Sequence, residues 1–226
     1  MSSEKKTKKN ITIDGPAASG KTSIGEKVAS LMAYKFLDTG LMYRAVAHKS
    51  LISGLEVSEE HKIIELCHQI NIAFDSKTKE ILVDGENITD QLRKRHVDQR
   101  VSLIAKLPNV RKVLVSQQRI IAGSNDMVMV GRDIGTIVLP RAKHKFYLTA
   151  SLEVRAERRY KEFTGFRTKI LYDEILLEME ERDRVDKSRK DSPLKPAEDA
   201  VTVDTTEMSF ETAVGTILNV IEGTIT

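Results

Sequence analysis

Residues 11–32 read Ile-Thr-Ile-Asp-Gly-Pro-Ala-Ala-Ser-Gly-Lys-Thr-Ser-Ile-Gly-Glu-Lys-Val-Ala-Ser-Leu-Met. Residues 15–22 of this stretch match the pattern G-x-x-x-x-G-K-[ST] without a mismatch. A short apolar run precedes the match, and apolar residues at helical spacing follow it, namely Ile24, Val28, Leu31 and Met32. A strand, a glycine-rich loop and a helix in this order predict a P-loop that binds a nucleoside triphosphate.

The residue types of the loop explain this chemistry. Gly15 and Gly20 permit backbone angles that bring successive N–H groups around an anion, and the following helix adds the positive end of its dipole. We expect Lys21 to reach the outer phosphates and the Thr22 hydroxyl to ligate Mg²⁺. The predicted triphosphate-binding residues are Gly15, Pro16, Ala17, Ala18, Ser19, Gly20, Lys21, Thr22 and Ser23.

The composition is that of an ordinary globular protein. Of the 226 residues, 40% are hydrophobic and 31% are charged, and the length allows one domain with insertions or two small domains. The net charge of +3 is too balanced for a protein that coats nucleic acid, so we expect no stable nucleic-acid partner. The N-terminus does not read as a signal peptide, and no apolar run approaches the ~20 residues of a membrane span. We therefore expect a cytoplasmic protein without a membrane partner.

Five short apolar runs are interpreted as buried parallel strands. They lie around residues 11–13, 35–37, 127–130, 145–148 and 200–203. Helical patterns follow most of them, which predicts an α/β fold. Ligands of such sheets bind beyond the carboxyl ends of the strands, so we expect residues 14–22, 38–44 and 131–135 at the ligand edge.

Two stretches depart from this alternation. Apolar runs at residues 71–74 and 80–83 flank the polar residues 75–79, which predicts a hairpin inserted away from the main sheet. Residues 160–169 are polar with a central glycine, and we interpret them as a flexible flap between two helices.

Two further segments are interpreted as core alone. The single cysteine, Cys67, lies among isoleucine and leucine residues, which favours a buried structural thiol and excludes an internal disulfide. Ser209 is expected to cap the last helix. The residues that this helix is predicted to bury are Phe210, Val214, Ile217, Leu218 and Ile221.

Arginines recur at the predicted ligand edge and on the helices that follow it. Arg155, Arg158 and Arg159 share one face of a helix that Ser151 can cap. Arg182, Asp186 and Arg189 share a face if a helix from residue 171 persists to residue 192. Arg132-Asp133 and Tyr43-Arg44 each follow a strand. For any one of these, a solvated face of ion pairs is the alternative interpretation.

Taken together, the arginines favour phosphoryl transfer to a phosphate. The transferred group spreads negative charge over its oxygens, and guanidinium groups stabilise that charge. A hydroxyl acceptor needs a base, whereas a phosphate acceptor is already ionised and needs positioning. The predicted strand ends carry many arginines and no histidine, so a phosphate acceptor is favoured.

Several motifs of the chain closely resemble those of bacterial-type cytidylate kinases. They are Ile-Asp-Gly-Pro at residues 13–16, Leu-Asp-Thr-Gly-Leu-Met-Tyr-Arg at 37–44, Gly-Arg-Asp-Ile-Gly-Thr at 131–136, Glu-Arg-Asp at 181–183, Ser-Pro-Leu at 192–194 and Ala-Glu-Asp-Ala at 197–200. The resemblance implies an adenylate-kinase-like α/β fold, in which helices flank a P-loop-type parallel sheet of five strands. It also implies an insertion that binds a nucleoside monophosphate (NMP) and a short LID.

The resemblance further implies domain limits. These are a flexible tail at residues 1–10, CORE at 11–38, an NMP-binding region with the hairpin at 39–107, CORE at 108–156, LID at 157–170 and CORE at 171–226.

Residue roles follow from the same resemblance. The CMP phosphate is assigned to Thr39, Arg44 and Arg132, the cytosine edge to Ser102, Arg111 and Asp133, and the ribose to Arg182 and Asp186, while Arg189 reaches the phosphates. The full CMP-binding set is Thr39, Tyr43, Arg44, Ser102, Arg111, Arg132, Asp133, Arg182, Asp186 and Arg189. The catalytic set is Lys21, Arg132, Arg158, Arg182 and Arg189, and Thr22 is the metal ligand. One position departs from the family, because Val130 stands where an acidic residue is usual.

The expected activity is phosphoryl transfer from ATP to CMP and dCMP with Mg²⁺, by a monomeric enzyme. A kinase acting on UMP or AMP is the alternative within the same fold. A nucleotide-dependent switch is the alternative outside enzymes, but a guanine-specific switch needs an N-K-x-D element that this sequence lacks.

Overall fold

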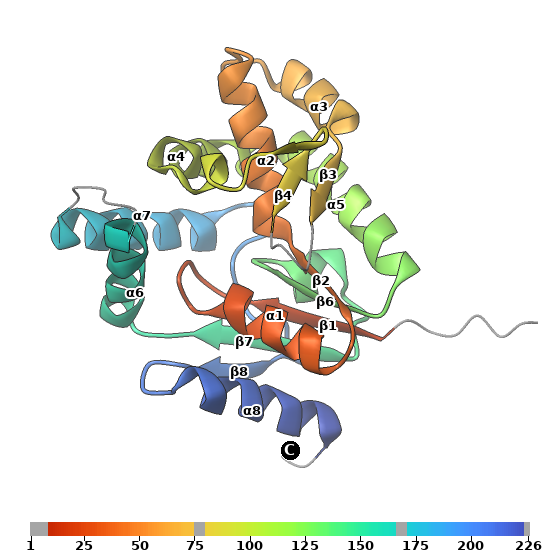
Figure 1. The fold of residues 1–226 in the computed structure, drawn as a ribbon, viewed down its shortest axis with the longest axis vertical. Helices are drawn as coiled ribbons and strands as arrows, with labels where there is room; N and C mark the ends of the chain where they lie inside the picture. Colours follow the sequence, from red (N-terminus) through yellow and green to blue (C-terminus); the bar gives the residue numbers. More distant parts are fainter. Residues whose placement is uncertain (1–8, 75–79, 166–170, 224–226) are drawn as a thin grey trace, which may run out of the picture. The chain divides into compact units, whose positions relative to one another are not determined.

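The computed structural model describes residues 9–74, 80–165 and 171–223, and the chain divides into two compact units. The first unit comprises Met1–Phe36 and Asn125–Thr226, and the second comprises Leu37–Ser124 (Figure 1). Within the described ranges, no helix is long and apolar enough to cross a membrane.

A five-stranded sheet forms the centre of the first unit. Its strands are β1 (Asn10–Asp14), β2 (Lys35–Asp38), β6 (Met127–Gly131), β7 (His144–Thr149) and β8 (Val201–Asp204), in the spatial order β2-β6-β1-β7-β8. β1 pairs in parallel with β6 and with β7, and β7 pairs in parallel with β8. All five predicted strands are therefore confirmed, and the spatial order places β1, which precedes the P-loop, at the centre of the sheet.

Side chains alternate along a strand, so the two faces of β1 carry different residues, one face apolar and the other polar. Ile11 and Ile13 are buried against α1 (Lys21–Leu31) and α8 (Phe210–Glu222), which lie side by side over the sheet (Figure 1). Thr12 and Asp14 are buried on the opposite face, where the loop after β6 covers them. An apolar core thus holds β1 from one side and leaves the other side for polar groups.

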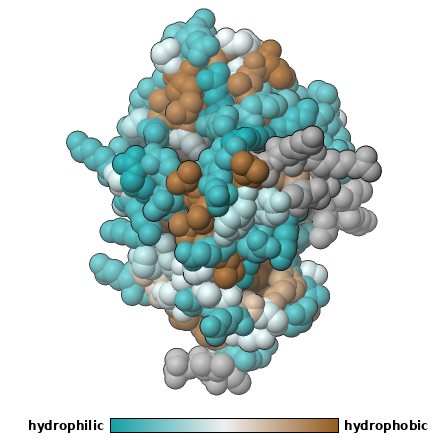
Figure 2. Space-filling view, turned by 90° about the vertical axis from the view of Figure 1, so that its left-hand side faces the viewer, coloured by the Kyte–Doolittle hydropathy of each residue, from teal (hydrophilic) through white to brown (hydrophobic). Residues whose placement is uncertain are grey.

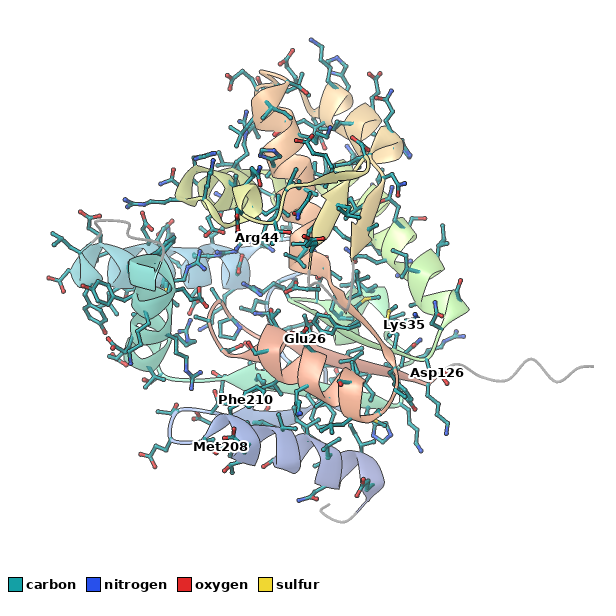
Figure 3. All side chains as sticks on the ribbon, viewed as in Figure 1. Glu26, Lys35, Arg44, Asp126, Met208 and Phe210 are labelled. Atoms are coloured by element: carbon teal, nitrogen blue, oxygen red, sulfur yellow. The ribbon has the colours of Figure 1, made fainter. Side chains whose placement is uncertain are left out.

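The last helix confirms one prediction and corrects another. Ser209 caps α8 by accepting a hydrogen bond from the backbone N–H of Thr212 at 3.1 Å. Val214 and Ile217 are buried as predicted, but Phe210 is 42% exposed. Phe210 is the first residue of α8, so its side chain lies at the end of the helix (Figure 3).

Two predicted helix limits are also corrected. The proposed flap begins too early, because α6 (Leu152–Gly165) continues through residues 160–165, and Phe163 is buried against α7 (Tyr172–Ser188). Residues 166–170 of the flap lie outside the described ranges. α7 ends at Ser188 rather than near residue 192, because the chain turns back and the N–H of Leu194 donates to the carbonyl oxygen of Asp186.

The second unit is mostly helical. It contains α2 (Thr39–Ile52), α3 (Glu60–Gln69), α4 (Arg95–Ile104), α5 (Pro108–Ser124), the short 3-10 helix Gln91–Arg93, and a sheet of β3 (Ile72–Phe74), β4 (Ile81–Val83) and β5 (Glu86–Asn87). The predicted hairpin is confirmed by the antiparallel pairing of β3 with β4, although its connection at 75–79 lies outside the described ranges. The third strand, β5, was not predicted, because two residues are too few to show an alternating pattern.

The core of the second unit includes Val46, Ile63, Leu92 and Leu114. Cys67 lies in the same core, and burial raises the pKa of its thiol to about 11, so the interpretation as a structural thiol is supported. Residues 108–124 belong to this unit because α5 packs on α3 and α2, whereas the family resemblance implied CORE for them. The other domain limits remain predictions.

Candidate active site

The P-loop between β1 and α1 is shaped by close backbone contacts. A Cβ atom on Gly15 would lie 2.1 Å from the carbonyl oxygen of Leu148, so only glycine fits against β7. Gly15 and Gly20 both have positive φ angles, of 152° and 88°, which favour glycine. Lys21 is buried, and its ammonium donates to the carbonyl oxygen of Pro16 at 2.8 Å. The loop therefore folds around its own lysine at the N-terminus of α1.

Asp14 ends β1 directly before this loop and faces the segment after β6. Its carboxylate accepts hydrogen bonds from the backbone N–H groups of Ile134 and Gly135, at 2.8 and 2.7 Å. Burial raises the pKa of Asp14 from its usual 3.8 to about 6, while the two N–H groups and Lys21 lower it and Asp133 raises it further. Asp14 was not among the predicted site residues.

Arg155 on α6 connects the P-loop to α7. One of its terminal nitrogens lies 2.7 Å from the Asp183 carboxylate, and another donates to the carbonyl oxygen of Ala17 at 3.4 Å. The side chains of Arg155 and Asp183 are both largely buried. Neither residue was predicted as part of the site, although the spacing of Arg155 and Arg158 placed both on one helix face.

Arg158, a predicted catalytic residue, lies against the back of the P-loop. Its guanidinium donates to the backbone oxygen of Thr205 at 2.8 Å, to the Thr205 hydroxyl at 3.1 Å and to the carbonyl oxygen of Ala18 at 3.5 Å. Arg159 shares the helix but lies over the ring of Phe163, 4.4 Å from its centroid. The structure therefore gives P-loop contacts for two of the three arginines that were grouped on this helix.

Asp186 on α7 is the shared partner of the other predicted arginines. Arg132 donates through Nε to its carboxylate at 3.1 Å, and Arg189 forms an ion pair with the other carboxylate oxygen. Burial by itself raises the pKa of Asp186, but the charges of Arg132, Arg189 and Arg182 outweigh it and hold the pKa below its usual value. Arg189 is the residue directly after the end of α7, three positions from Asp186.

The remaining predicted residues belong to the second unit. Arg44 on α2 forms an ion pair with Asp98 on α4 and donates to the carbonyl oxygen of Leu92 at 2.9 Å (Figure 3). The guanidinium carbon of Arg111 lies 5.7 Å from the centroid of the Tyr43 ring, in a cation–π contact. Arg44, Tyr43 and Arg111, all predicted to bind CMP, thus each contact a residue of this unit.

Two more members of the predicted set lie on the same helices. Thr39 is the buried first residue of α2, where Asp38 caps the helix by accepting from the N–H of Gly40 at 2.8 Å. The Ser102 hydroxyl on α4 is 3.4 Å from the carbonyl oxygen of Asp98, which is a long hydrogen bond. The predicted residues therefore form two groups, one in each compact unit.

Polar and apolar residues are mixed on the face of the molecule drawn in Figure 2, where brown patches alternate with teal. Large apolar side chains that are exposed include Ile120 and Leu177, from different elements. Exposed apolar residues of this kind are usual on globular proteins and do not define a site.

The five-stranded parallel sheet and the P-loop place the chain in the class of P-loop nucleotide-binding folds. A shikimate kinase from Bacteroides thetaiotaomicron has the same fold, with a TM-score of 0.51, 10% identity, and coverage of 95% of this chain and 98% of that one. An uncharacterized protein from Eubacterium ventriosum is similar at a TM-score of 0.52 and 12% identity, over 95% of this chain and 99% of the other.

Sequence comparison narrows this class to one family. The cytidylate kinase family model matches residues 11–223. A cytidylate kinase from Caldanaerobacter subterraneus is 43% identical over 204 residues, 90% of each chain. Cytidylate kinases from Desulforamulus reducens, 43% identical, and Listeria monocytogenes, 42% identical, cover 95% and 94% of this chain and 97% and 95% of their own. The chain belongs to the cytidylate kinase family.

Proposed function

We propose that this protein transfers the γ-phosphoryl group of ATP to CMP and dCMP, forming ADP and CDP or dCDP. The observation that carries the proposal is the gathering of Arg132, Arg189 and Arg182 around Asp186, in the unit that holds the P-loop. Cationic donors beside a triphosphate site suit the transfer of a phosphoryl group to a second phosphate.

On the donor side, the backbone N–H groups of the P-loop and the N-terminus of α1 bind the ATP phosphates. Lys21 exchanges its bond to the carbonyl oxygen of Pro16 for the outer phosphate oxygens. Arg155 and Arg158 bond to the carbonyl oxygens of Ala17 and Ala18, so they hold the loop in the shape that receives the triphosphate. This support reduces the reorganisation that the reaction needs.

On the acceptor side, the CMP phosphate competes with Asp186 for the arginines. Asp186 keeps Arg132 and Arg189 close together while no substrate is bound, and its other acceptor capacity suits the ribose hydroxyls. The phosphate is already ionised, so no general base is required. Asp133, Ser102 and Arg111 are proposed to contact the cytosine edge.

Mg²⁺ is the proposed cofactor, and the residues present fit a site with few protein ligands. Thr22 is exposed in the first turn of α1, next to Lys21, and offers a hydroxyl oxygen of the kind that Mg²⁺ prefers. Val130, in place of the usual acidic residue, is fully buried in the core between the sheet and α1, so it offers no ligand. When bound, the ion neutralises charge on the phosphates. We further propose that the enzyme acts as a monomer in the cytoplasm.

A coupled assay of ADP release tests the proposal, with ATP as donor and CMP, dCMP, UMP and AMP as acceptors. We expect the highest kcat/KM with CMP or dCMP. Faster reaction with AMP or UMP contradicts the acceptor assignment, and no reaction with any monophosphate contradicts the function.

Lys21→Ala is the matched test of the donor side. Loss of the ammonium removes a charge that stabilises the transferring group, so we expect kcat to fall on the order of 10²-fold or more. Lys27→Ala on the exposed face of the same helix is the control and should leave kcat unchanged. Near wild-type kcat in Lys21→Ala contradicts phosphoryl transfer at this P-loop.

A further inference from the structure

The chain links its P-loop strand to the predicted acceptor residues through one buried side chain. Asp14 is the last residue of β1, and the two N–H groups that donate to it belong to Ile134 and Gly135. These two residues directly follow Arg132 and Asp133. Both distances, 2.8 and 2.7 Å, are those of strong hydrogen bonds to a carboxylate.

The segment that donates these hydrogen bonds is a short π-helix, Ile134–Val138. Asp133 occupies its N-cap position, yet within the described residues its side chain makes no capping hydrogen bond to this helix. The backbone carbonyl oxygen of Asp133 accepts hydrogen bonds from the N–H groups of Ile137 and Val138, at 2.8 and 3.2 Å. Asp14 therefore caps the helix from a neighbouring strand, and the side chain of the N-cap residue is not needed for that role.

The contact is also tight. A Cβ atom on Gly135 would lie 3.0 Å from the Thr12 hydroxyl oxygen, 3.3 Å from a side-chain carbon of Lys145 and 3.4 Å from the Asp14 carboxylate. The loop thus lies directly on the polar face of the sheet. Displacement in one direction is blocked by these side chains, and displacement in the other breaks two hydrogen bonds to a buried carboxylate.

We propose that Asp14 is a positioning residue, which fixes the backbone after Asp133 and thereby holds Arg132 and Asp133 in place for the acceptor nucleotide. The inference rests on the proposed transfer to a nucleoside monophosphate. Asp14 touches neither reacting group in this scheme. Its effect passes through the loop, so its loss weakens acceptor binding and base choice more than ATP binding.

Steady-state kinetics of Asp14→Asn test the proposal. The amide keeps one acceptor oxygen but loses the charge, and its NH₂ group cannot accept from the second backbone N–H. We expect KM for CMP to rise about tenfold, as for the loss of one charge-assisted hydrogen bond, with KM for ATP changed less than about twofold. The CMP-to-UMP ratio of kcat/KM should fall, because Asp133 is no longer held in one position.

Two other variants make the result decisive. Gly135→Ala pushes the loop away from the Thr12 hydroxyl without altering Asp14, so it should raise KM for CMP in the same selective way. Asp126→Asn is the matched control, because the Asp126 carboxylate also accepts from a backbone N–H, that of Lys9 at 2.9 Å (Figure 3). Asp126 lies before β6, whereas the N–H partners of Asp14 lie in the segment after β6. This control should leave both KM values unchanged.

Equal effects on KM for CMP and for ATP overturn the proposal, as does an unchanged KM for CMP in both test variants. If Asp14→Asn does not fold, the selectivity of Gly135→Ala decides. Failure of the proposed function is distinguishable from failure of this inference, because in that case the wild-type enzyme itself does not phosphorylate CMP. If the wild type prefers another monophosphate, the same comparison of acceptor and donor KM values is made with that acceptor.

Discussion

Two buried carboxylates of the first unit, Asp14 and Asp186, differ in their surroundings and therefore in their pKa. Asp186 faces three arginines, which hold its pKa down despite burial. Burial raises the pKa of Asp14 to about 6, because the backbone N–H groups of Ile134 and Gly135 and the charge of Lys21 do not offset it. The surroundings therefore disfavour the charged form of Asp14, whereas they favour the charged form of Asp186. The proposed contact of Asp14 with the loop nevertheless depends on its charged carboxylate.

The raised pKa of Asp14 predicts a pH effect on stability. Between pH 3.8 and about 6 the unfolded chain releases this proton while the folded chain retains it, so stability falls as the pH rises and then levels off. The shift corresponds to about 3 kcal/mol in the free energy of unfolding. Urea denaturation from pH 4 to pH 7 should show this loss in the wild type relative to Asp14→Asn. Parallel pH profiles for the two proteins would contradict it.

Asp133 gives a prediction about base choice. A carboxylate only accepts hydrogen bonds, and cytosine offers an amino group where uracil offers a carbonyl oxygen. Asp133→Asn can donate instead, so we expect kcat/KM for CMP to fall roughly ten- to hundredfold and the CMP-to-UMP ratio to narrow. The assay compares both acceptors at saturating ATP. If Asp133 only supports the loop, both substrates lose activity alike and the ratio stays constant.

At the scale of elements, helix ends determine where the site residues lie. The cap of α8 is local, since Ser209 bonds to the N–H of Thr212. Ser209→Ala should lower the free energy of unfolding by about 1 kcal/mol. Thr216→Ala is the control, because that exposed hydroxyl bonds only to the carbonyl oxygen of Thr212 within the same helix among the contacts described. Chemical denaturation measures both, and equal losses would show that the cap adds nothing.

The ends of α6 and α7 have a larger effect than their local sequence suggests. Phe163 and Tyr160 keep α6 helical because they pack against α7, with the rings of Tyr160 and Tyr172 6.1 Å apart. The end of α7 at Ser188 lets the chain turn back, so that the N–H of Leu194 donates to the carbonyl oxygen of Asp186. Arg189 pairs with Asp186 across three positions, a spacing that an intact helix would also allow.

At the scale of the whole molecule, the predicted donor and acceptor residues are distributed unequally between the compact units. The P-loop and its supporting arginines belong to the first unit, whereas Arg44, Ser102 and Arg111 belong to the second. We expect a non-hydrolysable ATP analogue to slow amide exchange in β1 and α1, and added CMP to slow it in α2 and α4. Hydrogen-exchange mass spectrometry measures these segments separately. Protection of α2 and α4 by the ATP analogue alone, with no further change on adding CMP, would contradict the assignment.

The sequence by itself determined the elements whose signals are local. The P-loop, the five strands, the β3–β4 hairpin and the Ser209 cap each depend on residues within a few positions of one another, so periodicity and spacing predicted them. The family motifs likewise lie in short runs, so the sequence alone indicated the cytidylate kinase family.

Only the tertiary structure decided which distant residues meet. Asp14 bonds to N–H groups 120 and 121 positions later, and Arg158 bonds to Thr205 47 positions away. No local pattern carries these contacts, because they depend on parallel pairing that sets β1 beside β6 and β7. Phe210 is a similar case, since helical spacing placed it on the apolar face of α8, whereas the tertiary structure leaves it 42% exposed at the first position of the helix.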